Sequence, residues 1–445
     1  MDSKNILILI PKRTNRVIYM LNHFFIEFMG ITTKFCTDEQ KFKDHNGPKM
    51  HYGYFALEDE FFIAADDILF ERGIQDLEIS FGEFNGLPSF FQTYSRQSQF
   101  TFDLFAASFY LISRYEEYLP FIKDKYGRFM AEESIAYKNG FLQKPIIDIW
   151  AIELQKKLKE FFPELMFNNK EYEFIPSIDI DAAYAYKHKG AFRTLGGYIK
   201  SVRDFNFKEI KRKTRVILNK EKDPFDNFDY IFQLHKEHGL KAIFFILFAD
   251  YGTNDKNTPT FNRYFKELVA YIADNANVGI HPSYTSNIIP SKLKKELKNL
   301  SKTVHFDINK SRQHFLILHL PSTYRNLINL EITDDYSMGY ASQYGFRAST
   351  SHSFLFYDLE MEYTTSLRIH PFAAMEGTLK DYQKMSVEEA KAAFENIIDE
   401  IKAVNGTYIS LWHNESLSNQ DRWVGWRNLY EEMIEYALSK GKAKS

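Results

Sequence analysis

In the second part of this chain, short continuous runs of apolar residues alternate with longer stretches in which apolar residues follow helical spacing. The pattern begins at about residue 170, with runs of strand length and with apolar residues at every third or fourth position of the longer stretches. This alternation favours parallel strands joined by helices, in a (β/α) barrel rather than an open sheet. The predicted strands are 173–178, 241–247, 278–281, 315–320, 344–348, 365–369 and 407–412, and the predicted helices are 226–238, 260–274, 291–302 and 386–404.

The first part of the chain shows a less regular mixture of short strands and amphipathic helices. Because 445 residues exceed one ordinary core, we predict two domains. Residues 1–168 form a smaller α/β domain whose role the pattern does not indicate. Residues 169–445 form a distorted (β/α) barrel of about seven parallel strands. In the first domain the predicted strands are 5–10, 49–55 and 61–64, and the predicted helices are 102–117 and 145–162.

Composition narrows the class of protein. Apolar residues at 44% and charged residues at 26% are typical of a globular protein, and a net charge of −3 does not favour nucleic-acid binding. The aromatic content of 17% supplies cores and surfaces on which sugars can stack. A single cysteine, Cys36, excludes an internal disulfide and fits a reducing compartment.

No signal peptide or membrane span is predicted. The apolar run 6–10 is short and follows an acidic residue, and no segment approaches 18 apolar residues. A cytoplasmic location is the expectation. The basic stretch 208–222 indicates a solvated helical face, with an anion-binding patch as the alternative.

Polar side chains that could do chemistry stand at the ends of several predicted strands. Asp179 and Asp181 end the first strand at i, i+2 spacing, so both point to the same side. They could serve as a base and a metal ligand, or could cap the next turn. His281 ends another strand and could bind a metal or be structural. His413 ends the last strand and could be a general acid or a buried, hydrogen-bonded histidine.

Other residues have weaker signals. Arg347 ends a predicted strand and could pair with a carboxylate, or could lie on the surface. His314 precedes its predicted strand, so we expect it at the opposite, stabilising face of the barrel. Residues 334–340 are expected to form a loop over the site. Trp423, Trp426 and Tyr430 could line a sugar-binding rim or, at helical spacing, belong to the core.

Five short motifs together resemble the polysaccharide deacetylase family, also called the NodB-homology or carbohydrate esterase family. The likeness extends over roughly residues 172–437, and the first part resembles a domain that precedes such barrels in some bacterial members. The motifs are Ser177-Ile178-Asp179-Ile180-Asp181, Ala242-Ile243-Phe244-Phe245, His281-Pro282-Ser283-Tyr284, Phe346-Arg347 and Leu411-Trp412-His413.

The resemblance implies a metal-dependent hydrolase that removes an acetyl group from an amino sugar of a polysaccharide or its precursor. A divalent metal, usually zinc, would bind Asp181 and His281. Asp179 would act as base, Arg347 would orient Asp179, and His413 would protonate the departing amine. The products would be acetate and a free amino sugar.

Three features depart from the family pattern. Ile180 separates the two aspartates, so the base and ligand roles of Asp179 and Asp181 could be exchanged. The family's Arg-x-Pro-Tyr loop, whose backbone helps to hold the oxyanion, is replaced by residues 347–350.

The family also has a second metal-binding histidine four residues after the first, and position 285 here is Thr. His314, Asp335 and Glu376 are candidates for a third ligand, and Glu376 could instead support a ligand. Two alternatives follow, namely a degenerate barrel that binds a glycan without hydrolysis and a hydrolase of another non-peptide C–N bond. The sequence does not indicate the sugar, the acyl group or the oligomeric state.

Overall fold

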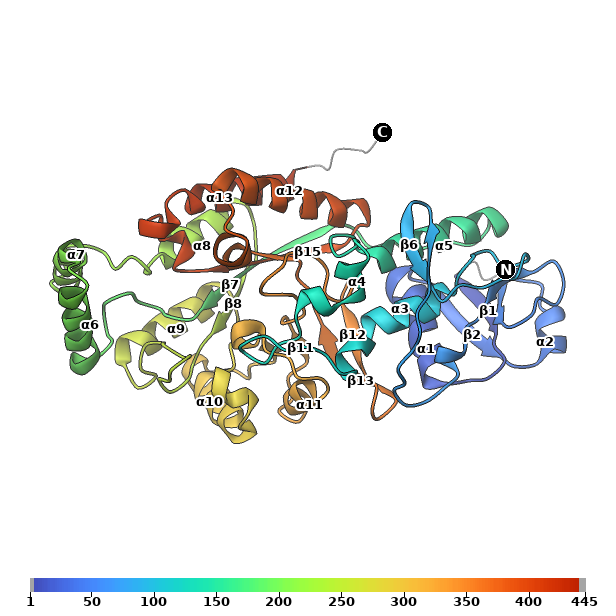
Figure 1. The fold of residues 1–445 in the computed structure, drawn as a ribbon, viewed down its shortest axis with the longest axis horizontal. Coiled ribbons are helices and arrows are strands. Elements are labelled where there is room, and N and C mark those ends of the chain that lie inside the picture. The colour runs from blue at the N-terminus through green and yellow to red at the C-terminus, as the bar shows by residue number, and fades with distance from the viewer. Residues whose placement is uncertain (1–3, 440–445) are drawn as a thin grey trace.

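The computed structural model describes residues 4–439, with two parallel sheets in separate stretches of the chain (Figure 1). The outermost residues of the two expected domains, 1–3 and 440–445, lie outside this range. The expected division at 168/169 falls between helix α5 (Ile146–Phe161) and strand β7 (Glu173–Ile180) and stays a prediction.

The smaller sheet has four parallel strands in the order β2-β1-β3-β4. The three strands predicted from apolar runs in this part are confirmed. The predicted helix 102–117 is shorter than expected, because Arg114 adopts a left-handed conformation (φ 57°) and the chain continues as a 3₁₀ turn. The elements of this part are β1 (Asn5–Leu9), α1 (Asn15–Asn22), β2 (Thr32–Cys36), α2 (Glu39–Lys43), β3 (Lys49–Gly53), β4 (Phe61–Ala64), β5 (Phe81–Phe84), β6 (Leu87–Phe90), α3 (Leu104–Ile112), α4 (Ile135–Lys138) and α5.

The larger sheet has nine strands in the order β12-β13-β11-β10-β9-β8-β7-β15-β14, and all its pairs are parallel except β12–β13. The fold is therefore mixed α/β with a large parallel sheet, as the alternation predicts. In residues 4–439 its end strands β12 and β14 are not paired with each other, and it has more strands than expected. The strands are β7, β8 (Ile243–Ile246), β9 (Asn277–Ile280), β10 (Lys310–Ser311), β11 (Asp334–Asp335), β12 (Phe354–Asp358), β13 (Tyr363–Ile369), β14 (Ala374–Met375) and β15 (Thr407–His413).

Two predicted strands are wrong. The run 315–320 begins with a 3₁₀ turn in which Phe315 has φ 59°, and Leu316 has φ 55°, so the backbone leaves the extended region. The run 344–348 is a buried loop in which the N–H of Phe346 donates to the carbonyl of Leu142 at 2.7 Å. Both runs are apolar because they are buried, not because they belong to a sheet. The strands that occupy these places, β10 and β11, have only two residues each.

The predicted helices of the second part are confirmed, with ends that differ by up to three residues. Two further helices, α6 (Ala191–Arg203) and α7 (Phe207–Ile217), form a hairpin that projects from one end of the molecule (Figure 1). None of the helices in residues 4–439 is long and apolar enough to cross a membrane. The remaining helices are α8 (Phe228–Glu237), α9 (Arg263–Asn275), α10 (Pro290–Val304), α11 (Ser322–Ile328), α12 (Val387–Ala403) and α13 (Trp426–Leu438).

A single continuous cluster of buried apolar side chains runs through both parts of the chain, from Ile6 in β1 to Ala437 in α13. Rings from the two parts meet in it, since Tyr357 of β12 lies 5.0 Å from Tyr19 and 5.3 Å from Phe109 between ring centroids. The first part thus packs against the large sheet through its core.

The pairing of β15 with β7 positions the site. These two strands are in register along their whole length, and their last pair is His413 with Asp179. Because parallel strands end at the same edge of a sheet, the polar residues that follow the apolar runs gather there. His281 directly follows β9 two strands away.

Candidate metal centre

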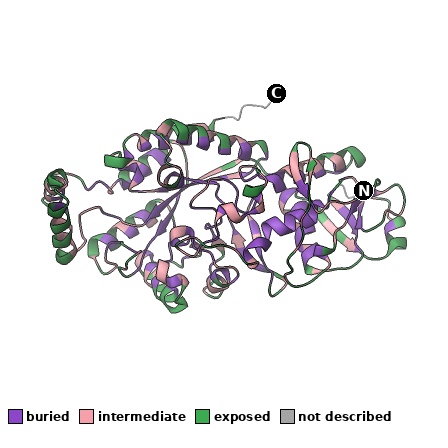
Figure 2. Cartoon of the chain, in the orientation of Figure 1, coloured by how far each residue is buried: buried purple, intermediate pink, exposed green. Residues whose placement is uncertain are grey.

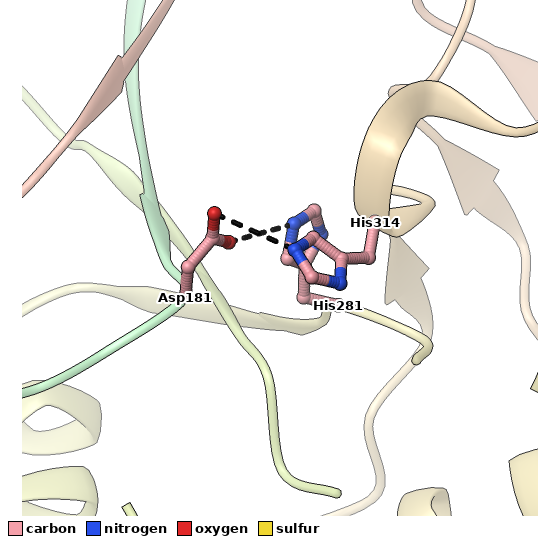
Figure 3. Close-up of side chains that lie close together, drawn as sticks. All are labelled: Asp181, His281 and His314. Carbon is pink, nitrogen blue, oxygen red and sulfur yellow. Dashed lines mark ion pairs between the residues drawn. The ribbon is translucent and has the colours of Figure 1, made fainter. Parts of the chain in front are cut away.

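Three side chains from three strand ends converge at this edge (Figure 3). Nε2 of His281 lies 3.2 Å from Oδ1 of Asp181, and Nε2 of His314 lies 3.5 Å from Oδ2 of the same carboxylate. One ligand atom from each residue lies within 4.8 Å of the other two. Both histidines are buried, while Asp181 is partly exposed.

Each of the two imidazole rings is fixed by a hydrogen bond at its Nδ1 atom. Nδ1 of His281 is hydrogen-bonded to the carbonyl of Arg312, and Nδ1 of His314 lies 2.8 Å from Oδ1 of Asp255. Asp255 is itself buried and accepts the backbone N–H of Tyr284 at 2.9 Å. Hydrogen bonds of this kind are typical of metal-binding histidines, because they fix the ring and leave Nε2 for the metal.

The electrostatics of Asp181 suit a ligand. Burial alone would raise its pKa, but the charge of His314 and hydrogen bonds from both histidines hold the pKa well below its usual value. Burial lowers the pKa of His314, yet Asp181 and Asp255 outweigh burial and raise it to about 9.

The donor set fits a metal. Oδ1 of Asp181 is a buried atom that lies 3.2 Å from Nε2 of His281, the ring nitrogen that the hydrogen bond to Arg312 leaves available. Two imidazole nitrogens and one carboxylate oxygen, next to an open pocket, form a donor set typical of catalytic zinc with three protein ligands. Asp181, His281 and His314 could therefore hold a divalent ion.

Asp179 lies beside this cluster and is held by a buried arginine. Its Oδ2 is 3.8 Å from Nε2 of His281, and its Oδ1 accepts a hydrogen bond from Nη1 of Arg312 at 2.8 Å. The same guanidinium also donates to the hydroxyl of Ser177 at 2.8 Å and to the carbonyl of Tyr336 at 3.0 Å. Arg312 is thus fixed on three sides and orients Asp179.

The expectation that Arg347 orients Asp179 is wrong. Arg347 is buried and binds Glu117 of the first part of the chain through two hydrogen bonds, at 2.9 and 2.6 Å. Glu117 also accepts Nε of Arg114 at 2.8 Å. Arg347 lies on the buried loop 344–348, not at the end of a strand, and this loop packs against the first part of the chain.

His413 also lines the pocket and is anchored by Glu376. Its Nδ1 is 2.8 Å from Oε1 of Glu376, which also accepts the backbone N–H of His413 at 2.9 Å. Nε2 of His413 is 3.8 Å from Oδ2 of Asp181. Burial lowers the pKa of His413, but Glu376 and then Asp181 outweigh it, so the pKa is raised well above its usual value. Nε2 of His413 therefore faces the centre, and the neighbouring carboxylates favour its protonated form.

The expectation that His314 lies at the opposite face is also wrong. It follows β10, which ends at Ser311, so His314 stands at the same strand end as the other ligands. The other candidates for a third ligand have different partners. Asp335 binds the hydroxyls of Ser311 and Ser337 inside the sheet, and Glu376 binds His413. Residues 334–335 form β11 instead of a loop.

Aromatic rings line the pocket above the cluster. Phe315, Tyr382 and Trp423 are lining residues. Of the three predicted rim aromatics, Trp423 lines the pocket although it is largely buried, and Trp426 and Tyr430 lie in the core. The first part of the chain also contributes, since Arg128 lines the pocket and donates to the carbonyl of Phe315 at 2.8 Å. It therefore supports the turn that carries His314.

Comparisons with known proteins cover the two parts differently. Residues 6–163 match the model of a family of unknown function, DUF7033. No curated protein matches the chain. Several solved structures align with about 60% of it, including the following three. One is a Mycobacterium smegmatis protein described as a polysaccharide deacetylase (11% identity, TM-score 0.41, 61% of this chain and 85% of that chain). Another is a CE4 family pseudoenzyme from Bacillus anthracis (11%, 0.30, 60% and 61%). The third is a polysaccharide deacetylase from Bacillus cereus (12%, 0.27, 60% and 88%). Likeness at this level decides nothing about the chemistry of this chain.

Proposed function

We propose that the protein is a metal-dependent hydrolase that removes the acetyl group from an N-acetylated amino sugar of a glycan or its precursor. One observation carries the proposal, namely that a cluster with the donor set of a catalytic zinc site lies between a carboxylate oriented by Arg312 and an imidazole anchored by Glu376. Asp179 and His413 come from adjacent strands that flank this cluster.

The roles follow from the contacts of each group. A zinc ion held by Asp181, His281 and His314 would polarise the acetyl carbonyl and acidify water. Asp179 takes a proton from the attacking water through Oδ2, the oxygen that does not bind Arg312. The water oxygen bonds to the acetyl carbon, and the C–N bond breaks.

His413 completes the reaction. Its Nε2 gives a proton to the departing nitrogen, and Glu376 stabilises the charged imidazole and fixes the ring. The products are acetate and a free amine. Phe315 and Tyr382 offer aromatic faces on which the apolar face of a sugar ring can pack, which favours a carbohydrate over a small amide.

The alternative of a glycan-binding protein without hydrolysis depended on Thr285, where the resembled family has its second histidine. His314 offers an imidazole from the neighbouring strand at a distance that suits a shared ion with Asp181. The missing residue therefore does not by itself favour loss of activity.

The test measures metal content and acetate release together. We expect close to one zinc per chain after zinc addition, and release of acetate and free amine from N-acetylated oligosaccharides. Asp179→Asn should retain zinc and lose acetate release, while Asp274→Asn, on the exposed face of α9, serves as the matched control. Zinc binding without acetate or amine release from any N-acetylated glycan would reject the hydrolase. Hydrolysis of non-sugar amides alone would reject the carbohydrate substrate.

A further inference from the structure

The α6–α7 hairpin exposes an unusual amount of apolar surface. Phe192 is 93% exposed and Phe205 is 79% exposed, whereas phenylalanine is usually buried in folded proteins. The hairpin projects at the end of the molecule away from the small sheet, and exposed residues predominate on it (Figures 1 and 2). The exposed apolar side chains of α6 and of the turn after it, named here the apolar row, are Phe192, Leu195, Ile199, Val202, Phe205 and Phe207.

The members of the apolar row on α6 occupy one face of the helix. Positions 192, 195, 199 and 202 recur every three or four residues, so they fall within one narrow stripe. The opposite face, which packs on α7, is polar. Tyr198 lies 2.8 Å from the hydroxyl of Thr214, and Lys213 donates to Ser201 at 3.2 Å. The hairpin is therefore closed by polar contacts, and the apolar row is left for something outside it.

The same segment is strongly basic. Residues 187–222 contain twelve Lys and Arg and three Asp and Glu, in a chain whose net charge is −3. Lys200, Lys208 and Lys211 are exposed, and none of the residues 4–439 forms an ion pair with them. Unpaired lysines beside an exposed apolar stripe are the pattern of a helix that lies in an anionic membrane surface.

The hairpin is tied to the mouth of the pocket. Arg212 pairs with Asp421, which directly precedes the pocket-lining residues Arg422 and Trp423. Arg193 donates to the carbonyl of Asn257 at 2.8 Å, two residues after Asp255, the carboxylate that holds His314. The hairpin is therefore linked to segments that line the pocket and hold one of the proposed metal ligands.

We propose that the α6–α7 hairpin docks the protein on the surface of a bilayer that contains anionic phospholipids. The apolar row enters the boundary between headgroups and acyl chains, and Lys200, Lys208 and Lys211 bind anionic headgroups. The helices have 13 and 11 residues, whereas a helix that crosses a bilayer needs about 20, so they lie in the surface. A second copy of the hairpin is disfavoured as the occupant, since it would bring an equal positive charge.

The test is vesicle flotation of the full chain, which has no catalytic readout and so does not depend on the proposed function. Vesicles of phosphatidylcholine alone are compared with vesicles that also contain phosphatidylglycerol. We expect binding only to the anionic vesicles, weakened by added salt.

Two triple variants separate the contribution of the apolar row from that of the three lysines, and each variant has a matched control. Phe192→Ser/Leu195→Ser/Ile199→Ser is compared with Phe55→Ser/Tyr94→Ser/Ile122→Ser, which changes exposed apolar residues of the first part. Lys200→Glu/Lys208→Glu/Lys211→Glu is compared with Lys294→Glu/Lys298→Glu/Lys302→Glu on the exposed face of α10. The hairpin variants should bind at least on the order of 100-fold more weakly and the controls should bind as the unchanged protein does.

Three results would overturn the proposal. One is a lack of binding of the unchanged protein to anionic vesicles. Another is equal weakening by the hairpin variants and their controls. The last is a dimer in solution that the apolar hairpin variant converts to monomers while vesicle binding is unaffected. Because all substituted side chains are exposed, circular dichroism should show unchanged folding, and the lysine variant tests the proposal if the apolar variant fails to fold.

Discussion

Two buried guanidinium–carboxylate pairs in this molecule look alike and differ in what the carboxylate can still do. Arg312 binds one oxygen of Asp179, and the other oxygen faces His281 and the pocket. Glu117 has both oxygens occupied, because Arg347 binds each of them and Arg114 binds one as well. The first carboxylate can accept a proton from a ligand, whereas the second joins two parts of the chain.

This difference shows which property indicates function. Burial and an arginine partner are common to both carboxylates, so neither feature separates a base from a structural ion pair. What separates them is an oxygen directed at a pocket beside a candidate metal site.

The largest expected effect is on turnover. Asp179→Asn removes the proposed base but keeps the size of the side chain, so kcat/KM should fall by about 10³-fold with zinc content unchanged. Glu117→Gln should leave kcat/KM per folded molecule within a few-fold of the unchanged protein. Steady-state kinetics with zinc analysis checks both. Equal losses of turnover in the two variants would remove the distinction between the pairs.

The next effect concerns the metal. His314→Ala removes a proposed ligand, so zinc affinity should fall by more than about 100-fold, as measured by competition with a chelator. Asp255→Asn should lower it by about 10- to 100-fold, because the ring of His314 loses its anchor. Zinc affinity that survives His314→Ala would exclude this histidine from the site. Glu117→Gln again serves as the control.

The third effect concerns stability. Arg347→Met leaves Glu117 buried with one arginine instead of two, so the free energy of unfolding should fall by about 3 kcal/mol. Activity per folded molecule should change little. Urea unfolding beside an assay at low denaturant measures the two quantities. A variant of normal stability would show that the pair does not hold the two parts together.

The smallest effect is on the pH dependence of stability. Burial raises the pKa of Glu117, but Arg347 and then Arg114 outweigh it and hold the pKa below the ordinary value of 4.5. The pair therefore contributes stability above pH 4.5, and this contribution is lost as pH falls toward the lower folded-state pKa. Between pH 6 and 3.5, the melting temperature of Glu117→Gln should decrease less steeply with falling pH than that of the unchanged protein. Identical slopes would contradict this assignment.

The strands with long apolar runs could be predicted from the sequence, and so could the residues at their ends. Asp179, Asp181, His281 and His413 were expected at strand ends, and β7, β9 and β15 bring them to one edge of the sheet. Their catalytic and ligand roles remain proposals. These strands read as continuous apolar runs because each is paired on both sides and buried on both faces.

The parts of the site on short elements could not be predicted in this way. Arg312 and His314 follow β10, whose two residues have no period to detect. Arg347 was misplaced because the run 344–348 is apolar from burial against Leu142, which a sequence cannot distinguish from burial in a sheet. The only signal for His314 was the absence of a histidine at position 285, which calls for a replacement from elsewhere.

The unbroken core between the small and large sheets has consequences for the chain as a whole. Heat should melt the protein in one cooperative transition, because neither part can lose its packing alone. A fragment that begins at residue 169 would expose Tyr357 and its neighbours to water and would tend to aggregate. The segment that precedes the large sheet therefore covers apolar surface that the rest of the chain would otherwise expose to water.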